Sequence, residues 1–255
     1  MRTLSLMLML ALAAPVLAAD EKVITREITF TSGKEEIKGF LAMPQGKGPF
    51  PGIVVIQEWW GLNPWIQDQA KRLAAQGYVC LAPDLYRGKV ATEMATARKL
   101  MMGMPIDRAL RDIKGATDAL AELKEVNKEK LGVIGWCLGG GLALQSSLAD
   151  KRLTACVICY GRVIPDAEKL EPLNAAVLGV FGKEDKGIPV ATVRKFGEAL
   201  KKAGKTVEAL HEYEAGHGFM REKNGPKENP EHRAGPAKEA WAEIEKFFAA
   251  RLKGK

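Results

Sequence analysis

The chain has 255 residues, of which 27% are charged, and its formal net charge is +7 at neutral pH. Its basic residues are scattered and do not form the clusters with interleaved aromatic rings that nucleic-acid-binding proteins use, so we expect no nucleic-acid partner. A chain of this length can bury a full hydrophobic core in a single α/β domain.

The first nineteen residues have the three-part layout of a secretory signal peptide. Arg2 gives a basic start, residues 4–14 form an uncharged apolar run, and Ala18 and Ala19 supply small side chains for cleavage. The run is too short to span a bilayer, and no later apolar stretch is long enough to do so. We expect an exported protein, periplasmic or secreted, with cleavage near Ala18/Ala19 and one domain over residues 20–255. A buried N-terminal helix or a membrane anchor is the alternative.

Strand-like and helical segments alternate along the rest of the chain. This alternation predicts an α/β fold with a mostly parallel twisted sheet and helices on both faces. The expected strands span residues 23–31, 36–43, 52–56, 78–82, 131–136, 153–160, 175–181 and 207–213. The expected helices lie within residues 63–77, 92–126, 142–148, 189–202 and 237–252. Asn63 is the expected N-cap of the first helix, Pro64 opens it, and Pro105 marks a break within 92–126.

The segment Gly135-Trp136-Cys137-Leu138-Gly139 is the strongest chemical motif in the sequence. It follows an expected buried strand and opens an expected glycine-rich helix. This context is typical of the G-x-S-x-G nucleophile elbow of α/β-hydrolases, with sulfur in place of oxygen. The helix N-terminus would also favour a thiolate at Cys137. A buried cysteine in a glycine-rich turn is the alternative reading.

A cysteine nucleophile requires a base, and His217 is the best placed of three histidines. It follows the expected strand 207–213, where a loop is exposed at the carboxyl end of the sheet. His211 lies within that strand, so we expect it to be a packing residue. His232 lies in a polar stretch rich in proline and glutamate, so we expect it to be solvated.

The acid that orients the base lies between nucleophile and histidine in the chain order of this fold. Asp185 follows the expected strand 175–181 and has little side-chain crowding around it, which favours it for this role. Glu184 beside it and Asp166 after the preceding strand remain alternatives.

The strand 52–56 ends at Gln57-Glu58-Trp59. In α/β-hydrolases the loop after this strand and the residue after the nucleophile donate backbone N–H groups to the oxyanion, which assigns Trp59 and Leu138. A carboxylate at Glu58 is unexpected there, because it would oppose a developing negative charge. A solvated glutamate at a strand end is the alternative.

The remaining cysteines are Cys80, Cys156 and Cys159. Positions three apart in a strand point to opposite faces and lie about 10 Å apart, which is too far for a disulfide. We therefore expect Cys156 and Cys159 to be buried thiols rather than a redox pair, and all four thiols to be free despite export.

Taken together, the motifs resemble those of the dienelactone hydrolase family, from about residue 23 to residue 252. The matching segments are Gln57-Glu58, Pro83-Asp84-Leu85-Tyr86, Gly135-Trp136-Cys137-Leu138-Gly139-Gly140, Asp185 and Gly216-His217-Gly218-Phe219. The resemblance implies a cysteine nucleophile that forms a thioester with lactones and similar esters. It also implies that Glu58 holds the resting thiol neutral and takes its proton when substrate binds.

The sequence departs from this family in the expected substrate pocket. Arg221 matches one of two arginines with which founding members grip a substrate carboxylate, but residues 89–104 offer no clear match for the other; Arg98 is near it. Tyr86 and Tyr160 are further candidates for substrate binding, and Cys159-Tyr160 stands where the family tends to have two tyrosines. Founding members are also cytoplasmic, so the reaction type transfers better than the substrate.

We therefore expect a hydrolase of small esters or lactones, with an anionic substrate compatible with the basic charge. It requires no cofactor and no metal, and we expect a monomer. The alternatives are a general carboxylesterase, a non-catalytic binding protein that kept the pocket, and a thiol redox protein.

Overall fold

Two antiparallel strands, β1 (Val23–Ser32) and β2 (Glu35–Pro44), form one edge of the sheet. They match the strands expected over residues 23–31 and 36–43, and the turn that joins them contains Gly33 with φ of 63°. The computed structural model describes residues 23–224 and 226–254. The predicted signal peptide, residues 1–19, lies outside the described residues.

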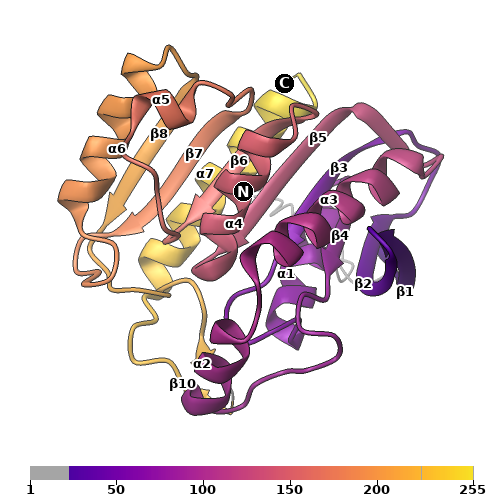
Figure 1. The fold of residues 1–255 in the computed structure, drawn as a ribbon, viewed down its shortest axis with the longest axis horizontal. Coiled ribbons are helices and arrows are strands. Elements are labelled where there is room, and N and C mark those ends of the chain that lie inside the picture. The colour runs from indigo at the N-terminus through magenta and orange to yellow at the C-terminus, as the bar shows by residue number, and fades with distance from the viewer. Residues whose placement is uncertain (1–22, 225, 255) are drawn as a thin grey trace, which may run out of the picture.

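Six further strands complete an eight-stranded sheet in the order β1-β2-β4-β3-β5-β6-β7-β8 (Figure 1). These strands are β3 (Phe50–Ile56), β4 (Val79–Pro83), β5 (Val126–Trp136), β6 (Leu153–Cys159), β7 (Ala176–Gly182) and β8 (Val207–Tyr213). β2 is antiparallel to both of its neighbours, whereas all the pairs from β4 to β8 are parallel. The loops after the parallel strands therefore open at one edge of the sheet, which is where ligands bind in such folds.

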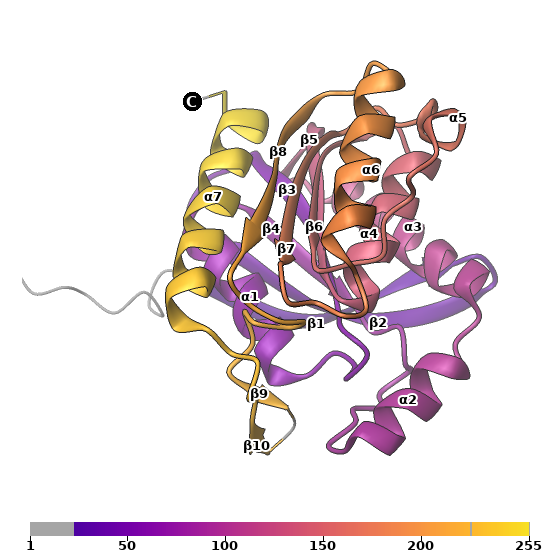
Figure 2. The same cartoon turned by 90° about the vertical axis from the view of Figure 1, so that its left-hand side faces the viewer.

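Helices cover both faces of the sheet, as the alternation predicts (Figure 2). One face carries α1 (Pro64–Ala75) and α7 (Ala234–Leu252), and the other carries α3 (Ile106–Glu122), α4 (Leu138–Ala149) and α6 (Val190–Lys202). Each face has its own apolar core, because the central strands are buried on both sides. α2 (Met94–Met102) and the short hairpin of β9 (Lys223–Asn224) and β10 (Lys227–Glu228) both project from the lower end of the molecule in Figures 1 and 2.

The ends of several elements follow from local chemistry. Asn63 caps α1 by accepting a hydrogen bond from the backbone N–H of Ile66 at 3.1 Å, and Pro64 occupies the first turn, as predicted. α2 and α3 are separated at Pro105, as predicted. β5 begins at Val126 rather than 131, because its polar first residues pair with the start of β3 at the sheet's end, where no hydrophobic pattern marks them. The four-residue helix α5 (Ala167–Leu170) was also missed.

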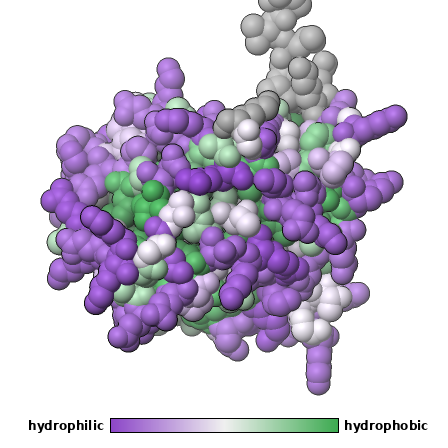
Figure 3. All heavy atoms as spheres, turned by 90° about the horizontal axis from the view of Figure 1, so that it is seen from above, coloured by the Kyte–Doolittle hydropathy of each residue, from purple (hydrophilic) through white to green (hydrophobic). Residues whose placement is uncertain are grey.

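The surface is mainly hydrophilic, with apolar side chains in small groups among polar ones (Figure 3). Four of the five exposed large apolar residues lie between positions 90 and 106, in and around α2: Val90, Met94, Met102 and Ile106. Within residues 23–224 and 226–254, none of the helices has both the length and the apolar character needed to cross a bilayer.

Candidate active site

Cys137 occupies a sharp turn between β5 and α4. Its backbone has φ of 53°, a left-handed value that is uncommon for a residue with a β-carbon. A β-carbon at Gly135 would collide with the carbonyl of Gly139, and one at Gly139 would lie 2.5 Å from the carbonyl oxygens of Ile56 and Gln57. The two glycines therefore allow the tight turn and bring the end of β3 against the start of α4.

His217 and Asp185 meet at the same edge of the sheet. The loop after β8 carries His217 and the loop after β7 carries Asp185, and Nδ1 of the imidazole lies 2.7 Å from Oδ2 of the carboxylate. The other carboxylate oxygen, Oδ1, accepts hydrogen bonds from the backbone N–H groups of Gly187 and Ile188, at 2.8 and 2.9 Å. The acid is thus fixed by its own loop, and the imidazole is oriented by the acid.

The electrostatics of this group follow from its contacts. Burial raises the pKa of Asp185, but the hydrogen bond from His217 and the two backbone N–H groups outweigh it and leave the pKa below its usual value. Burial lowers the pKa of His217. The Asp185 carboxylate and the Cys137 side chain outweigh this effect and raise the pKa to about 10. His217 thus pairs with the Asp185 carboxylate and is influenced by the Cys137 side chain.

The alternative acids have other roles in the fold. Glu184 is exposed, and Asp166 caps α5 by accepting hydrogen bonds from the backbone N–H groups of Glu168 and Lys169. Asp185 is therefore the acid that the fold brings to His217.

The two other histidines lie elsewhere. His211 is half-buried in β8, as predicted, with Nε2 3.8 Å from a carboxylate oxygen of Glu243. The expectation that His232 is solvated was wrong: it is partly buried and Nδ1 lies 2.9 Å from the carbonyl oxygen of Phe219. Its segment folds back onto the His217 loop, a long-range contact that composition does not reveal.

Glu58 is buried, so the reading of a solvated glutamate at the strand end was wrong. Only 1% of the residue is exposed, and its carboxylate forms an ion pair with Arg221 and accepts a hydrogen bond from the Tyr160 hydroxyl at 3.3 Å. The ring of Tyr160 meets the His217 ring edge-on, with centroids 5.3 Å apart. Glu58 is therefore held by Arg221 and Tyr160, and Tyr160 separates it from the His217 imidazole.

Arg221 is buried beside Glu58 rather than presented to solvent. Its guanidinium lies 5.5 Å from the Trp60 ring centroid, and its Nε donates to the carbonyl of Lys223 at 2.7 Å. Asn229 fixes this loop, because its Nδ2 donates to the carbonyls of Gly218 and Arg221, at 2.9 and 2.8 Å. Sequence reasoning missed Trp60 and Asn229; the aromatic pair at 59–60 was a signal for the first, and the polar surroundings of Asn229 gave none.

The two expected oxyanion donors flank the elbow. Leu138 is the first residue of α4, where a backbone N–H has no acceptor within the helix. Trp59 lies in a turn in which the N–H of Gly61 donates to the carbonyl of Glu58 at 3.2 Å. The N–H of Trp59 takes no part in that hydrogen bond. The close approach at Gly139 brings the two segments together.

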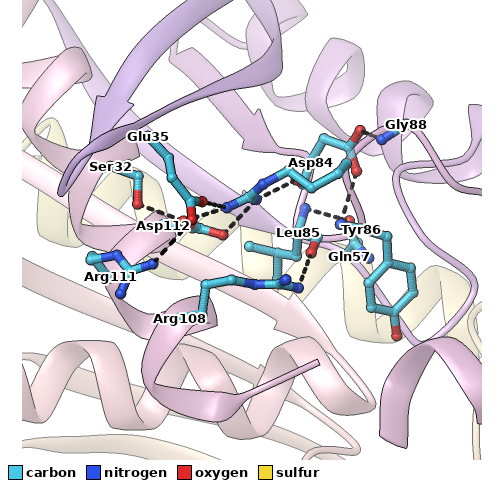
Figure 4. A network of polar contacts seen from close by, with 11 residues as sticks. Ser32, Glu35, Gln57, Asp84, Leu85, Tyr86, Gly88, Arg108, Arg111 and Asp112 are labelled. Atoms are coloured by element: carbon cyan, nitrogen blue, oxygen red, sulfur yellow. Dashed lines mark hydrogen bonds and ion pairs between the residues drawn. The ribbon is translucent and has the colours of Figure 1, made fainter. Parts of the chain in front are cut away.

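Tyr86 stands on a loop held from two sides (Figure 4). Asp84 accepts hydrogen bonds from the backbone N–H groups of Tyr86, at 3.0 Å, and of Gly88. Gln57, next to Glu58, accepts one from the N–H of Leu85 at 3.3 Å. The position of Tyr86 is thus tied to the strand end that carries Glu58.

An ion pair between Arg87 and the buried Asp112 anchors the same loop to α3. Arg87 donates to both carboxylate oxygens of Asp112, at 2.7 and 3.1 Å, and to Glu35 at 2.8 Å. Asp112 also accepts from the Ser32 hydroxyl and is fully buried within α3. These contacts join α3, β1 and the Tyr86 loop into one polar network (Figure 4).

Comparison with known proteins places this geometry in a family. The sequence pattern of the dienelactone hydrolase family matches residues 37–252. The chain belongs to the dienelactone hydrolase family. This family member is therefore a hydrolase of the α/β-hydrolase superfamily, as the elbow motif predicts.

Relatives of this dienelactone hydrolase family member align along most of their length. A Methylorubrum extorquens protein provisionally named carboxymethylenebutenolidase is 32% identical in an alignment 259 positions long, which covers 93% of this chain and 87% of the relative. The crystal structure of a provisionally assigned dienelactone hydrolase from Klebsiella pneumoniae has a TM-score of 0.79 at 28% identity and covers 89% of this chain and 98% of its own. A metagenomic protein described as a dienelactone hydrolase-like promiscuous phosphotriesterase has a TM-score of 0.81 at 27% identity, over 91% and 99% of the two chains.

Proposed function

We propose that the protein hydrolyses small esters or lactones through a thioester on Cys137. The observation that carries this proposal is the Asp185–His217 pair, with Nδ1 and Oδ2 2.7 Å apart, beside the Cys137 turn at the ends of three parallel strands. It supplies a nucleophile, a base and an orienting acid in the chain order of the α/β-hydrolase fold.

The reaction follows from this arrangement in two halves. The Cys137 sulfur attacks the ester carbonyl while His217 holds the thiol proton. The C–O bond then breaks, and His217 gives that proton to the leaving alkoxide. In the second half His217 takes a proton from water, the hydroxide attacks the thioester, and the carboxylic acid leaves as the thiol is restored. In both halves the backbone N–H groups of Trp59 and Leu138 stabilise the oxyanion.

Glu58 and Arg221 extend the proposal to the resting state. A carboxylate in a partly dry site disfavours a thiolate nearby, because two like charges would lie close together. A substrate with its own anionic group would compete with Glu58 for the guanidinium of Arg221. Freed from that ion pair, Glu58 would be able to take the thiol proton and pass it to His217, which then gives it to the leaving alkoxide.

The deciding experiment is turnover of 4-nitrophenyl butyrate by the wild type and by Cys137→Ala. Because the triad acts as a unit, we expect the substitution to lower kcat about a thousandfold or more. Near-ultraviolet circular dichroism should be unchanged, which shows that the fold is kept. Activity retained in Cys137→Ala would refute the proposal, and a wild type without turnover would favour the non-catalytic binding protein.

A further inference from the structure

A cavity of 400 Å³ lies where the start of α1, the loop between β4 and α2, and the segment that enters β9 come together. This volume falls in the usual range of small-molecule sites, about 300–1,000 Å³. The residues that line it include Asn63, Trp65, Asp68, Ala91, Glu222 and Lys223. The catalytic triad does not line it, so it is a separate place from the nucleophile.

Each of the three segments around this cavity is joined to the active site. Glu222 directly follows the buried arginine of that site. The N–H of Ala91 donates to the carbonyl of Trp60 at 2.9 Å, next to the turn that carries an assigned oxyanion donor. The ring of Trp65 meets the ring of Trp136 edge-on, with centroids 5.3 Å apart, and Trp136 directly precedes the nucleophile. The cavity therefore adjoins the place where the ester reacts.

Glu222 is held in place as a hydrogen-bond acceptor. Its Oε2 accepts from Nε1 of Trp65 at 2.9 Å, and its backbone carbonyl accepts from the N–H of Asn229 at 2.8 Å. Among the described residues no donor engages the other carboxylate oxygen, Oε1. Because the side chain is already ordered, a ligand hydroxyl that binds Oε1 loses little affinity to the ordering of this residue.

The chemistry of the lining indicates a neutral ligand with several hydroxyl groups. Asp68 pairs with Lys71 at 2.9 Å, and Glu222 shares the cavity with Lys223, so neither charge dominates. The side-chain oxygen of Asn63 caps α1, which leaves its amide N–H groups as donors for a ligand. A hydroxyl both donates and accepts, which suits this mixture of groups. The indole ring supplies apolar surface for the C–H face of a polyol.

We propose that this cavity binds a polyhydroxy group, of a sugar or another polyol, on the alcohol side of the ester. Glu222 accepts from its hydroxyls and Trp65 packs against its carbon skeleton. The assignment rests on the proposed esterase function. The alcohol side is indicated because His217, which gives its proton to the leaving alkoxide, lies on the loop after β8 that runs on to Glu222. The substrate class is then an ester of a sugar or polyol.

Binding of methyl β-glucoside tests the cavity without turnover. Saturation-transfer NMR would compare the wild type, Glu222→Ala and Glu222→Gln. We expect Glu222→Ala to raise the dissociation constant about tenfold, the loss of one charge-assisted hydrogen bond, and Glu222→Gln to raise it less, because an amide oxygen still accepts. Glu228→Ala is the matched control, since Glu228 is exposed on β10 and does not line the cavity. Equal affinity in all four proteins, or no saturation transfer to the glucoside, would overturn the site.

Kinetics then show whether the polyol belongs to the substrate. Glucose 6-butyrate and cyclohexylmethyl butyrate share the acyl group and the size of the ring, but only the first carries hydroxyls. The ratio of their kcat/KM values, from titration of the released acid, should fall about tenfold in Glu222→Ala and stay constant in Glu228→Ala. A constant ratio in both variants would overturn the assignment to the substrate, and weakened glucoside binding beside it would indicate a free polyol as the ligand. Failure of the esterase proposal would appear instead as turnover retained in Cys137→Ala.

Discussion

The imidazole of His217 is stabilised in its protonated form by its two neighbours. Nδ1 of the ring lies 2.7 Å from the Asp185 carboxylate, and the Cys137 side chain also favours the protonated ring. Although burial opposes the charge, these contacts raise the pKa to about 10. An imidazolium is a suitable counter-charge for a thiolate, which supports the proposal that Cys137 is the nucleophile.

Replacement of Asp185 should therefore lower the pKa of His217. NMR titration of the ring should give a midpoint near pH 10 in the wild type and a lower one in Asp185→Asn. Because the folded pKa is raised, the stabilisation is complete below the unfolded value of about 6.5 and is lost as pH rises through about 10. The free energy of unfolding should fall over this window, and fall less in Asp185→Asn. Asp166→Asn is the control; identical titrations in all three proteins would contradict the assignment.

Glu58 should restrain the thiol when no substrate is bound. Glu58→Gln removes a buried negative charge next to Tyr160 and His217, so we expect iodoacetamide to trap Cys137 faster at neutral pH while ester turnover slows. The matched control is Glu245→Gln, which removes the carboxylate of an exposed pair with Arg72 on the molecule's surface. If the pH profiles of trapping coincide in wild type and Glu58→Gln, Glu58 has no part in the mechanism.

Among the elements, the contact between the end of β3 and the start of α4 positions the chemistry. Gly139 allows these two segments to touch, and the segments carry Trp59 and Leu138, whose backbone N–H groups we assign to the oxyanion. The spacing of the elbow motif thus does more than permit a tight turn. It sets the separation of the two donors.

Gly139→Ala should disturb this separation. The new β-carbon would lie 2.5 Å from the carbonyl oxygens of Gln57 and Ile56, which are backbone atoms and cannot simply rotate away. We expect a loss of about tenfold or more in kcat, because a misplaced oxyanion donor is costly, together with a lower melting temperature. Gly235→Ala in α7 is the control, since nothing lies within 4 Å of its added β-carbon. Equal kcat in the two variants would contradict the close-approach argument.

The sequence predicts most of the elements, and it proposes Cys137, Asp185 and His217, because both depend on local pattern. The elbow, Asn63 and Pro64 each have a signature of a few adjacent residues. The ion pair of Glu58 and Arg221 joins segments far apart in the chain, and the roles of Asn229 and His232 depend on how a polar segment folds back. Such contacts are fixed by tertiary packing, for which one sequence offers no local pattern.

At the scale of the whole molecule, the thiols are distributed between two cores. β6 places Cys156 in the core under α3 and α4 and Cys159 in the core under α1 and α7, as alternation along a strand requires. Cys80 lies in the second of these cores, and all four cysteines are free in the structure. The sheet itself separates Cys156 from Cys159.

We propose that the chain is exported and that its mature form keeps four free thiols. Mass spectrometry of the protein from its native host should find a mature N-terminus at Ala19 or Asp20. Thiol counting on the denatured, unreduced protein should give four. A count of two would reveal a disulfide and refute the strand argument, whereas an intact N-terminus would refute export.

Because thiols are buried on both sides of one sheet, the rates at which they are alkylated report opening motions of the protein. In the native state only Cys137 is partly exposed, and burial raises the pKa of Cys156 to about 12, so the other thiols react only when their surroundings open. Pulsed alkylation read by peptide mass would then time the two faces separately: Cys156 reports release of α3 and α4, and Cys159 reports release of α1 and α7. Equal alkylation rates would mean that the two helix layers open together, and unequal rates would show which layer opens first.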